Sequence, residues 1–112
     1  MERAVLKKKA EGHVKGAGYK LLEDKSGFDI CGVKVKGPAV GDEYLAVGCN
    51  VYDEVTIRYV NPFIEKFNAF KAFKLPPGSL SSVKGLIAYS GNGPTPAIRR
   101  KAEAAGIEIK KL

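Results

Sequence analysis

The chain ends in KGLIAYSGNGPTPAIRRKAEAAGIEIKKL, residues 84–112, and this stretch decides the fold. Its apolar start, residues 84–90, predicts a short buried strand, and the glycines of residues 91–94 break it. Thr95-Pro96 then opens a helix, because threonine can cap a helix and proline fits a first turn that needs no N–H donor. Gly106 ends this helix, and residues 107–109 alternate like a final strand. Strand, turn, helix and strand in succession predict an α/β protein with a sheet covered by helices.

The preceding residues predict more elements of the same kind. Residues 44–49 are nearly all apolar, as expected of a central strand that is covered on both faces. Asn61 and Pro62 are typical of a helix start, whereas residues 55–60 leave open whether they form a strand or lead into that helix. The expected elements are helices over 3–17 and 61–73, strands over 19–23, 28–35 and 44–49, and a loop over 75–82. The predicted order is therefore helix, three strands, helix, strand, helix, strand.

The second helix contains four phenylalanines, which are Phe63, Phe67, Phe70 and Phe73. Their spacing is that of a buried helix face, so we expect them to form core rather than a platform for stacking bases. His13 is the single histidine, and we expect it on a helix surface without a Cys or Ser partner.

Composition places the chain in a broad class. At 112 residues it fits one domain, residues 1–112, with no run of ~20 apolar residues to cross a bilayer and no apolar signal segment near Met1. Cys31 and Cys49 lack the number and spacing of a disulfide framework or a metal site, and their apolar neighbours predict small buried thiols. We expect a cytoplasmic protein. The absence of Gln and Trp, with abundant Lys and Glu, leans toward a thermophile.

The net charge of +7 is unevenly distributed. Residues 1–25 contain seven basic and four acidic residues, and residues 84–112 contain six and two, whereas residues 26–83 balance at six and six. Excess positive charge therefore lies toward both ends of the chain. This pattern favours a polyanionic partner such as nucleic acid, although a lysine-rich solvated surface would produce the same count.

A resemblance to a known family makes these expectations more specific. Residues 87–91 (IAYSG), 95–97 (TPA) and 102–108 (AEAAGIE) resemble the C-terminal part of Mrr-like restriction endonuclease domains. These domains belong to the PD-(D/E)XK nuclease superfamily, which also contains the archaeal Holliday junction resolvases. The resemblance implies a restriction-endonuclease-like α/β fold with a central mixed sheet flanked by helices. It also implies Mg²⁺-dependent cleavage of DNA, if the catalytic residues are present.

The family's catalytic residues are an Asp at the start of the second strand, an acid on the third strand and a Lys two residues further on. Hard cations need oxygen ligands, and residues two apart on a strand point to the same face, so the last two residues converge on one phosphate. Asp29 matches the first position, and Glu11 matches an additional acid of many members. The third strand departs from the pattern, because Gly48 stands for the acid and Asn50 for the lysine.

Substitutes for the missing residues are few. Glu43 precedes Gly48 by five residues, roughly 16 Å along a strand, and is too far away. Glu65 and Lys66 lie on the second helix, where some members carry a relocated catalytic residue. Residues 108–110 repeat acid-x-Lys on a strand that is wrong for the fold. Residues 90–93 could bind an anion before a helix, but we expect a structural turn there.

Three hypotheses follow. The first is a catalytically degenerate nuclease-like protein that binds nucleic acid, in particular DNA, and needs no cofactor. The second is an active Mg²⁺-dependent endonuclease built on Asp29 as metal ligand, with Glu11. The third is a protein-interaction subunit of a nuclease or repair complex, and by analogy with the fold we expect a homodimer. The residues expected to contact nucleic acid are Lys7, Lys8, Lys9, Arg58, Lys66, Arg99 and Arg100.

Overall fold

The structure, a computed structural model, describes residues 3–37 and 39–112. Met1, Glu2 and Pro38, which the predicted domain 1–112 includes, lie outside the described residues. The helices are α1 (Arg3–Gly16), α2 (Ile57–Lys74) and α3 (Pro96–Ala104). The strands are β1 (Lys20–Leu21), β2 (Ile30–Val35), β3 (Asp42–Asn50), β4 (Ser82–Tyr89) and β5 (Ile107–Lys111). The element order confirms the predicted one.

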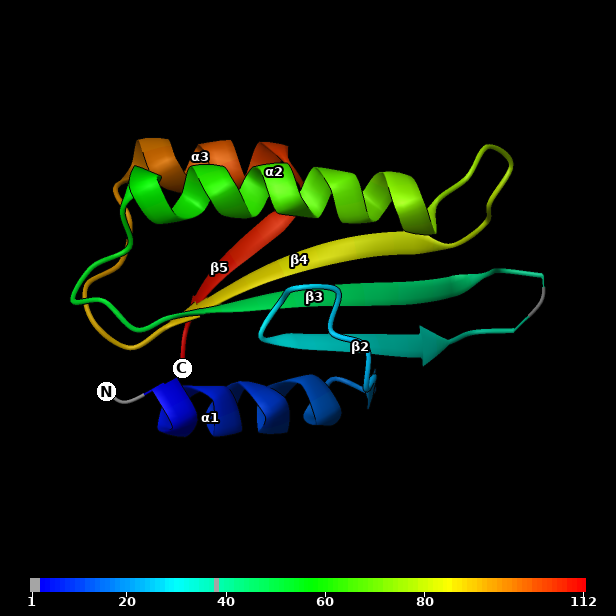
Figure 1. Cartoon of the computed structure of the whole chain (residues 1–112), viewed down its shortest axis with the longest axis horizontal. Coiled ribbons are helices and arrows are strands. Elements are labelled where there is room, and N and C mark those ends of the chain that lie inside the picture. The colour runs from blue at the N-terminus through cyan, green and yellow to red at the C-terminus, as the bar shows by residue number, and fades with distance from the viewer. Residues whose placement is uncertain (1–2, 38) are drawn as a thin grey trace.

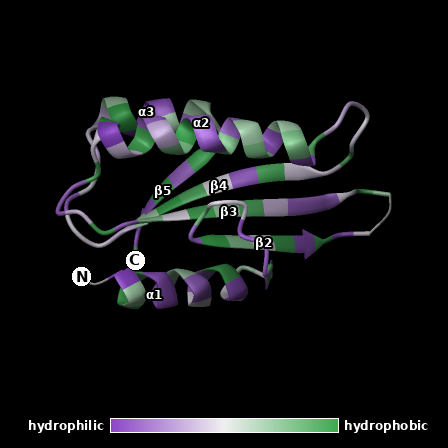
Figure 2. Ribbon diagram, in the orientation of Figure 1, coloured by the Kyte–Doolittle hydropathy of each residue, from purple (hydrophilic) through white to green (hydrophobic). Residues whose placement is uncertain are grey.

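The five strands form one mixed sheet in the order β1-β2-β3-β4-β5. The pairs β1–β2 and β2–β3 are antiparallel, whereas β3–β4 and β4–β5 are parallel. Helix α1 covers one face of the sheet, and α2 and α3 lie side by side over the other (Figure 1). The helices carry mixed stripes of hydrophobic and hydrophilic residues, as expected when one side of each faces the sheet (Figure 2).

Each face of the sheet has its own hydrophobic cluster. Leu6, Ala10 and Val14 of α1 are fully buried against β3 and β4. On the other face Phe63, Phe67 and Phe70 of α2 pack on β3, β4 and β5. Strand β3 is therefore covered on both sides, as its apolar sequence predicts.

The prediction for the fourth phenylalanine is wrong. Phe73 is 77% exposed, because the buried face of α2 passes from Phe70 to the half-buried Lys74 and leaves Phe73 on the solvent side.

No described helix is both long and apolar enough to span a membrane.

The predicted start of the second helix is also wrong. Helix α2 begins at Ile57 after Thr56, so Pro62 lies inside it rather than in its first turn. Pro62 cannot donate a hydrogen bond to the Arg58 carbonyl, but both residues are exposed and water can satisfy that carbonyl. The additional turn buries Val60 completely, which favours helix over the strand that residues 55–60 left open.

The C-terminal unit agrees closely with its prediction. The Thr95 hydroxyl accepts a hydrogen bond from the Ile98 N–H at 3.4 Å, so Thr95 caps α3. Gly106 has φ of 84°, a conformation that glycine adopts without strain, and it ends α3 before β5. The remaining boundaries shift by a few residues. Strand β1 keeps only two of five predicted residues, β2 begins at Ile30 instead of residue 28, and β4 takes Ser82 from the expected loop.

Candidate functional site

The site begins with a pocket of about 270 Å³ between the start of α1, the start of β2 and the first half of α2. Asp29, Gly48 and Cys49 form its floor, where β2 begins and β3 ends. Its walls are Arg3, Gly27, Phe28, Arg58, Tyr59, Pro62, Phe63 and Lys66. The pocket therefore brings Asp29, the predicted metal ligand, together with Gly48, the predicted departure from the motif.

Both carboxylate oxygens of Asp29 have partners in the protein. Oδ2 accepts a hydrogen bond from the Cys49 backbone N–H at 2.7 Å, and Oδ1 lies 3.5 Å from a guanidinium nitrogen of Arg3. The Asp29 N–H in turn donates to the Val47 carbonyl at 3.0 Å. Asp29 thus joins the start of β2 to the end of β3, and the Arg3 guanidinium lies beside its Oδ1 atom.

Gly48 leaves a space that two aromatic side chains fill. A Cβ atom at this position would lie 2.6 Å from the Tyr59 hydroxyl oxygen and 2.7 Å from the Phe63 ring. Real Cβ atoms do not approach other atoms so closely, so any side chain here requires Tyr59 and Phe63 to move. Burial raises the pKa of Tyr59 well above its ordinary value, and the nearby Asp29 carboxylate adds to the effect. Tyr59 is therefore a neutral packing residue.

Asn50 stands at the lysine position of the family motif and is 1% exposed. Its Nδ2 donates to the Glu54 carbonyl at 3.1 Å, which holds the turn after β3. Its Oδ1 has no hydrogen-bond partner in the described parts of the chain. Asn50 therefore stabilises the turn after β3, and this position supplies no positive charge to the pocket.

The second predicted acid, Glu11, does not share the pocket of Asp29. It lines a separate hollow of about 210 Å³ together with Lys25. Lys7 lowers the pKa of Lys25, whereas the negative charges of Glu11 and Asp29 raise it. A lysine therefore lies within the electrostatic reach of both acids. Across residues 3–37 and 39–112, no three Asp, Glu, His or Cys side chains come together as a metal site.

The candidates on α2 have different environments. Lys66 lines the pocket, donates to the Gly27 carbonyl at 2.8 Å and lies 5.4 Å from the centre of the Phe28 ring. Arg58 lines the pocket and is exposed. Glu65 is exposed and does not line the pocket. Lys66 thus lies in the same pocket as Asp29, whereas Glu65, the candidate for a relocated catalytic carboxylate, lies outside it.

The other basic candidates divide into two groups. Lys7, Lys8 and Lys9 lie on α1, with Lys7 next to Lys25 and the other two exposed. Arg99 and Arg100 lie on α3, outside the pocket, and Arg99 donates to the Ile109 carbonyl at 2.7 Å. The sequence predictions missed Arg3 and Lys25, because only the fold brings the first turn of α1 and the β1–β2 loop to Asp29.

Cys49 forms part of the pocket floor but is a poor nucleophile. Burial raises its pKa to about 11, with a further contribution from Asp29, so the thiol is protonated at neutral pH. Burial likewise raises the pKa of Cys31 to about 11. Both thiols are free and buried, which confirms the prediction from their apolar neighbours.

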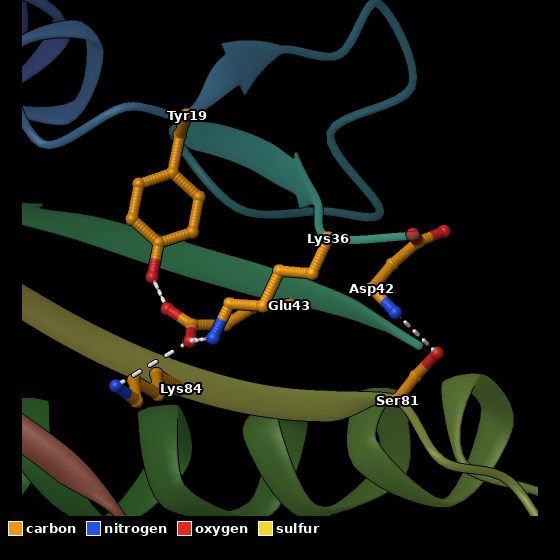
Figure 3. Close-up of polar contacts among 6 residues, drawn as sticks. All are labelled: Tyr19, Lys36, Asp42, Glu43, Ser81 and Lys84. Carbon is orange, nitrogen blue, oxygen red and sulfur yellow. Dashed lines mark hydrogen bonds and ion pairs between the residues drawn. The ribbon is translucent and has the colours of Figure 1, made fainter. Parts of the chain in front are cut away.

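Glu43 belongs to a separate polar cluster at the start of β3. It is 4% exposed and five residues from Gly48, so its side chain points to the opposite face of the sheet. The Tyr19 hydroxyl donates to one oxygen, while Lys36 and Lys84 lie 2.9 and 3.6 Å from the other (Figure 3). Glu43 is therefore fully engaged in a structural cluster and cannot replace the missing acid.

Replacing Tyr19 with phenylalanine is expected to lower the free energy of unfolding by about 1–2 kcal/mol, because a buried carboxylate loses a hydrogen-bond donor. Urea denaturation measures this loss. Tyr52→Phe is the matched control, because the Tyr52 side chain is exposed and its hydroxyl removal should change stability little. Equal stability of both variants would mean that Lys36 and Lys84 suffice for Glu43.

Comparison with known proteins identifies the fold. The structure of the restriction endonuclease FokI bound to DNA aligns with 98% of this chain at a TM-score of 0.57 and 19% sequence identity. The aligned part is 22% of that protein, so this chain spans about a fifth of its length. No family model and no curated protein sequence matches this chain. The protein therefore has a restriction-endonuclease-like fold.

Proposed function

We propose that this protein is a catalytically degenerate nuclease-like protein that binds DNA through the basic surface around Asp29. The observation that carries the proposal is the packing at Gly48. The place of the motif's second acid is filled by Tyr59 and Phe63, so the pocket lacks the second carboxylate with which the family motif holds Mg²⁺. The residue two positions on, Asn50, is buried and neutral.

Charge supports a nucleic-acid partner. The basic side chains of this surface come from three separate segments, and they are Arg3, Lys7, Lys25, Arg58 and Lys66. The two ammonium groups of Lys7 and Lys25 repel each other, and a phosphate between them would relieve that repulsion. The fold neighbour FokI is described in its DNA-bound state, which agrees with the same class of partner.

Binding should depend steeply on salt and little on base sequence. Each phosphate contact contributes a slope of about −0.9 in a plot of log affinity against log salt concentration. Arg58→Ala is expected to reduce the slope by about one unit and to weaken binding to all duplex sequences alike. Fluorescence anisotropy with a labelled duplex measures both. Lys71→Ala is the matched control, since Lys71 is an exposed lysine of α2 outside the pocket.

Two results would contradict the proposal. A flat salt response, or no binding at ordinary ionic strength, would exclude the basic surface as a DNA site. Cleavage of duplex or branched DNA with Mg²⁺ or Mn²⁺, abolished by Asp29→Ala, would instead support the active endonuclease. That the protein is an interaction subunit of a nuclease or repair complex, and that it forms a homodimer, remain predictions.

A further inference from the structure

Another hollow adjoins the pocket of Asp29 at the end of β3. It has a volume of about 520 Å³ and is lined by Tyr52, Asp53, Glu54, Thr56, Arg58 and Tyr59. Arg58 and Tyr59 also line the pocket of Asp29, so the two hollows are neighbours that share these side chains. The size lies within the range of small-ligand sites, which is about 300–1,000 Å³.

Tyr52 is an exposed aromatic residue on a well-fixed turn. Its side chain is 65% exposed, although the turn around it is braced. The Asp53 carbonyl accepts from the Asn92 N–H at 2.7 Å, and the Val55 N–H donates to the Asn92 carbonyl at 3.1 Å. Asn50 adds its hydrogen bond to the Glu54 carbonyl. Because the backbone of this turn is already fixed, a partner that stacks on the ring needs to order only the Tyr52 side chain.

The charges in this hollow are divided. Arg58 carries positive charge where the hollow meets the basic pocket, whereas Asp53 and Glu54 are exposed acids on the side of Tyr52. A phosphate is attracted to the first part and repelled by the second. The amino groups of a base suit the second part, because carboxylates accept hydrogen bonds from them. The flat face of Tyr52 offers a stacking surface beside these acids.

We infer that the hollow binds the base of an unpaired nucleotide, with Tyr52 as its stacking face and Arg58 as the contact to its phosphate. This inference rests on the proposed function and adds a preference to it. A paired base cannot stack on a protein ring while it remains within the helix, so the hollow selects DNA that contains a bulge, overhang or single strand.

The test compares two labelled DNA molecules, a perfect duplex and the same duplex with one additional, unpaired 2-aminopurine. The unchanged protein is expected to bind the second DNA about tenfold more tightly, as one base stacked on an aromatic ring would allow. The emission of the 2-aminopurine in this second DNA should fall on binding, because stacking quenches this fluorophore. Tyr52→Ala should remove both the preference and the quenching and leave duplex affinity unchanged.

Control variants separate stacking from structural effects. Tyr52→Phe keeps the ring and should retain the preference and the quenching. Phe73→Ala removes a comparably exposed ring elsewhere and should change neither. Equal losses for both DNA molecules in Tyr52→Ala would overturn the inference, since they would indicate a structural role for the ring or a general DNA contact.

The outcomes also distinguish this inference from the function on which it rests. Salt-dependent binding to both DNA molecules without a preference for the unpaired base would reject the base site and leave the basic DNA surface intact. Binding to neither DNA molecule would reject both.

Discussion

Gly48→Glu is expected to destabilise the protein strongly rather than to rebuild a metal site. The new side chain would meet the Tyr59 hydroxyl at 2.6 Å and the Phe63 ring at 2.7 Å from its first atom alone. Overpacking of this kind costs about 1–3 kcal/mol, and the desolvation of the new carboxylate adds to this cost even beside Arg58 and Lys66 of the pocket. The sum, about 3 kcal/mol or more, is a substantial part of the 5–15 kcal/mol that stabilises a typical domain.

Urea denaturation followed by circular dichroism measures this effect. Gly48→Ala isolates the contribution of the Cβ atom and should cost about 1–3 kcal/mol. Gly12→Ala is the matched control, because no atom lies within 4 Å of the added Cβ. In the middle of α1 it should stabilise the protein by up to about 1 kcal/mol. A stable Gly48→Glu variant that binds Mn²⁺ would mean that Tyr59 and Phe63 move aside easily, and it would revive the endonuclease hypothesis.

Phe67→Ala is expected to lower the free energy of unfolding by about 3–5 kcal/mol. Its side chain is fully buried, and its ring stacks on Phe63 with centroids 6.5 Å apart. The ring also fills the space over Gly85 of β4, where an added Cβ would lie 3.1 Å from it. Removing the ring therefore opens a cavity between α2 and the middle of the sheet.

Phe73→Ala on the same helix is the matched control. It makes the same change of helix propensity at a position that is 77% exposed, so its stability should stay within about 0.5 kcal/mol of the unchanged protein. The difference between the urea midpoints of the two variants then measures burial alone. Similar midpoints would mean that the α2 core can collapse around the missing ring.

The C-terminal unit could be predicted because its signals are local. Thr95 caps a helix that begins next to it, and Gly106 ends that helix through its own backbone conformation. The apolar run in β3 likewise predicts coverage on both faces, whatever the chain places there. Signals of this kind depend on a few neighbouring residues, and the surrounding structure agrees with them.

The start of α2 could not be predicted in the same way. Asn61 and Pro62 form a strong local start signal, but the burial of Val60 against the sheet extends the helix backwards by four residues. Tertiary packing overrides local preference here. A similar limit applies to the site. The sequence predicts a departure from the motif at Gly48 and Asn50, but the packing of Tyr59 over Gly48 depends on how α2 crosses β3.

The bond between Asp29 and the Cys49 N–H has a consequence for how relatives of this protein should be judged. An aspartate that fastens two strands remains useful after cleavage is lost, so selection can preserve it in an inactive lineage. Its presence in a homologue is then no sign of an enzyme. Position 48 is more informative, because a glycine there brings no carboxylate to the pocket of Asp29, whereas an acidic residue would.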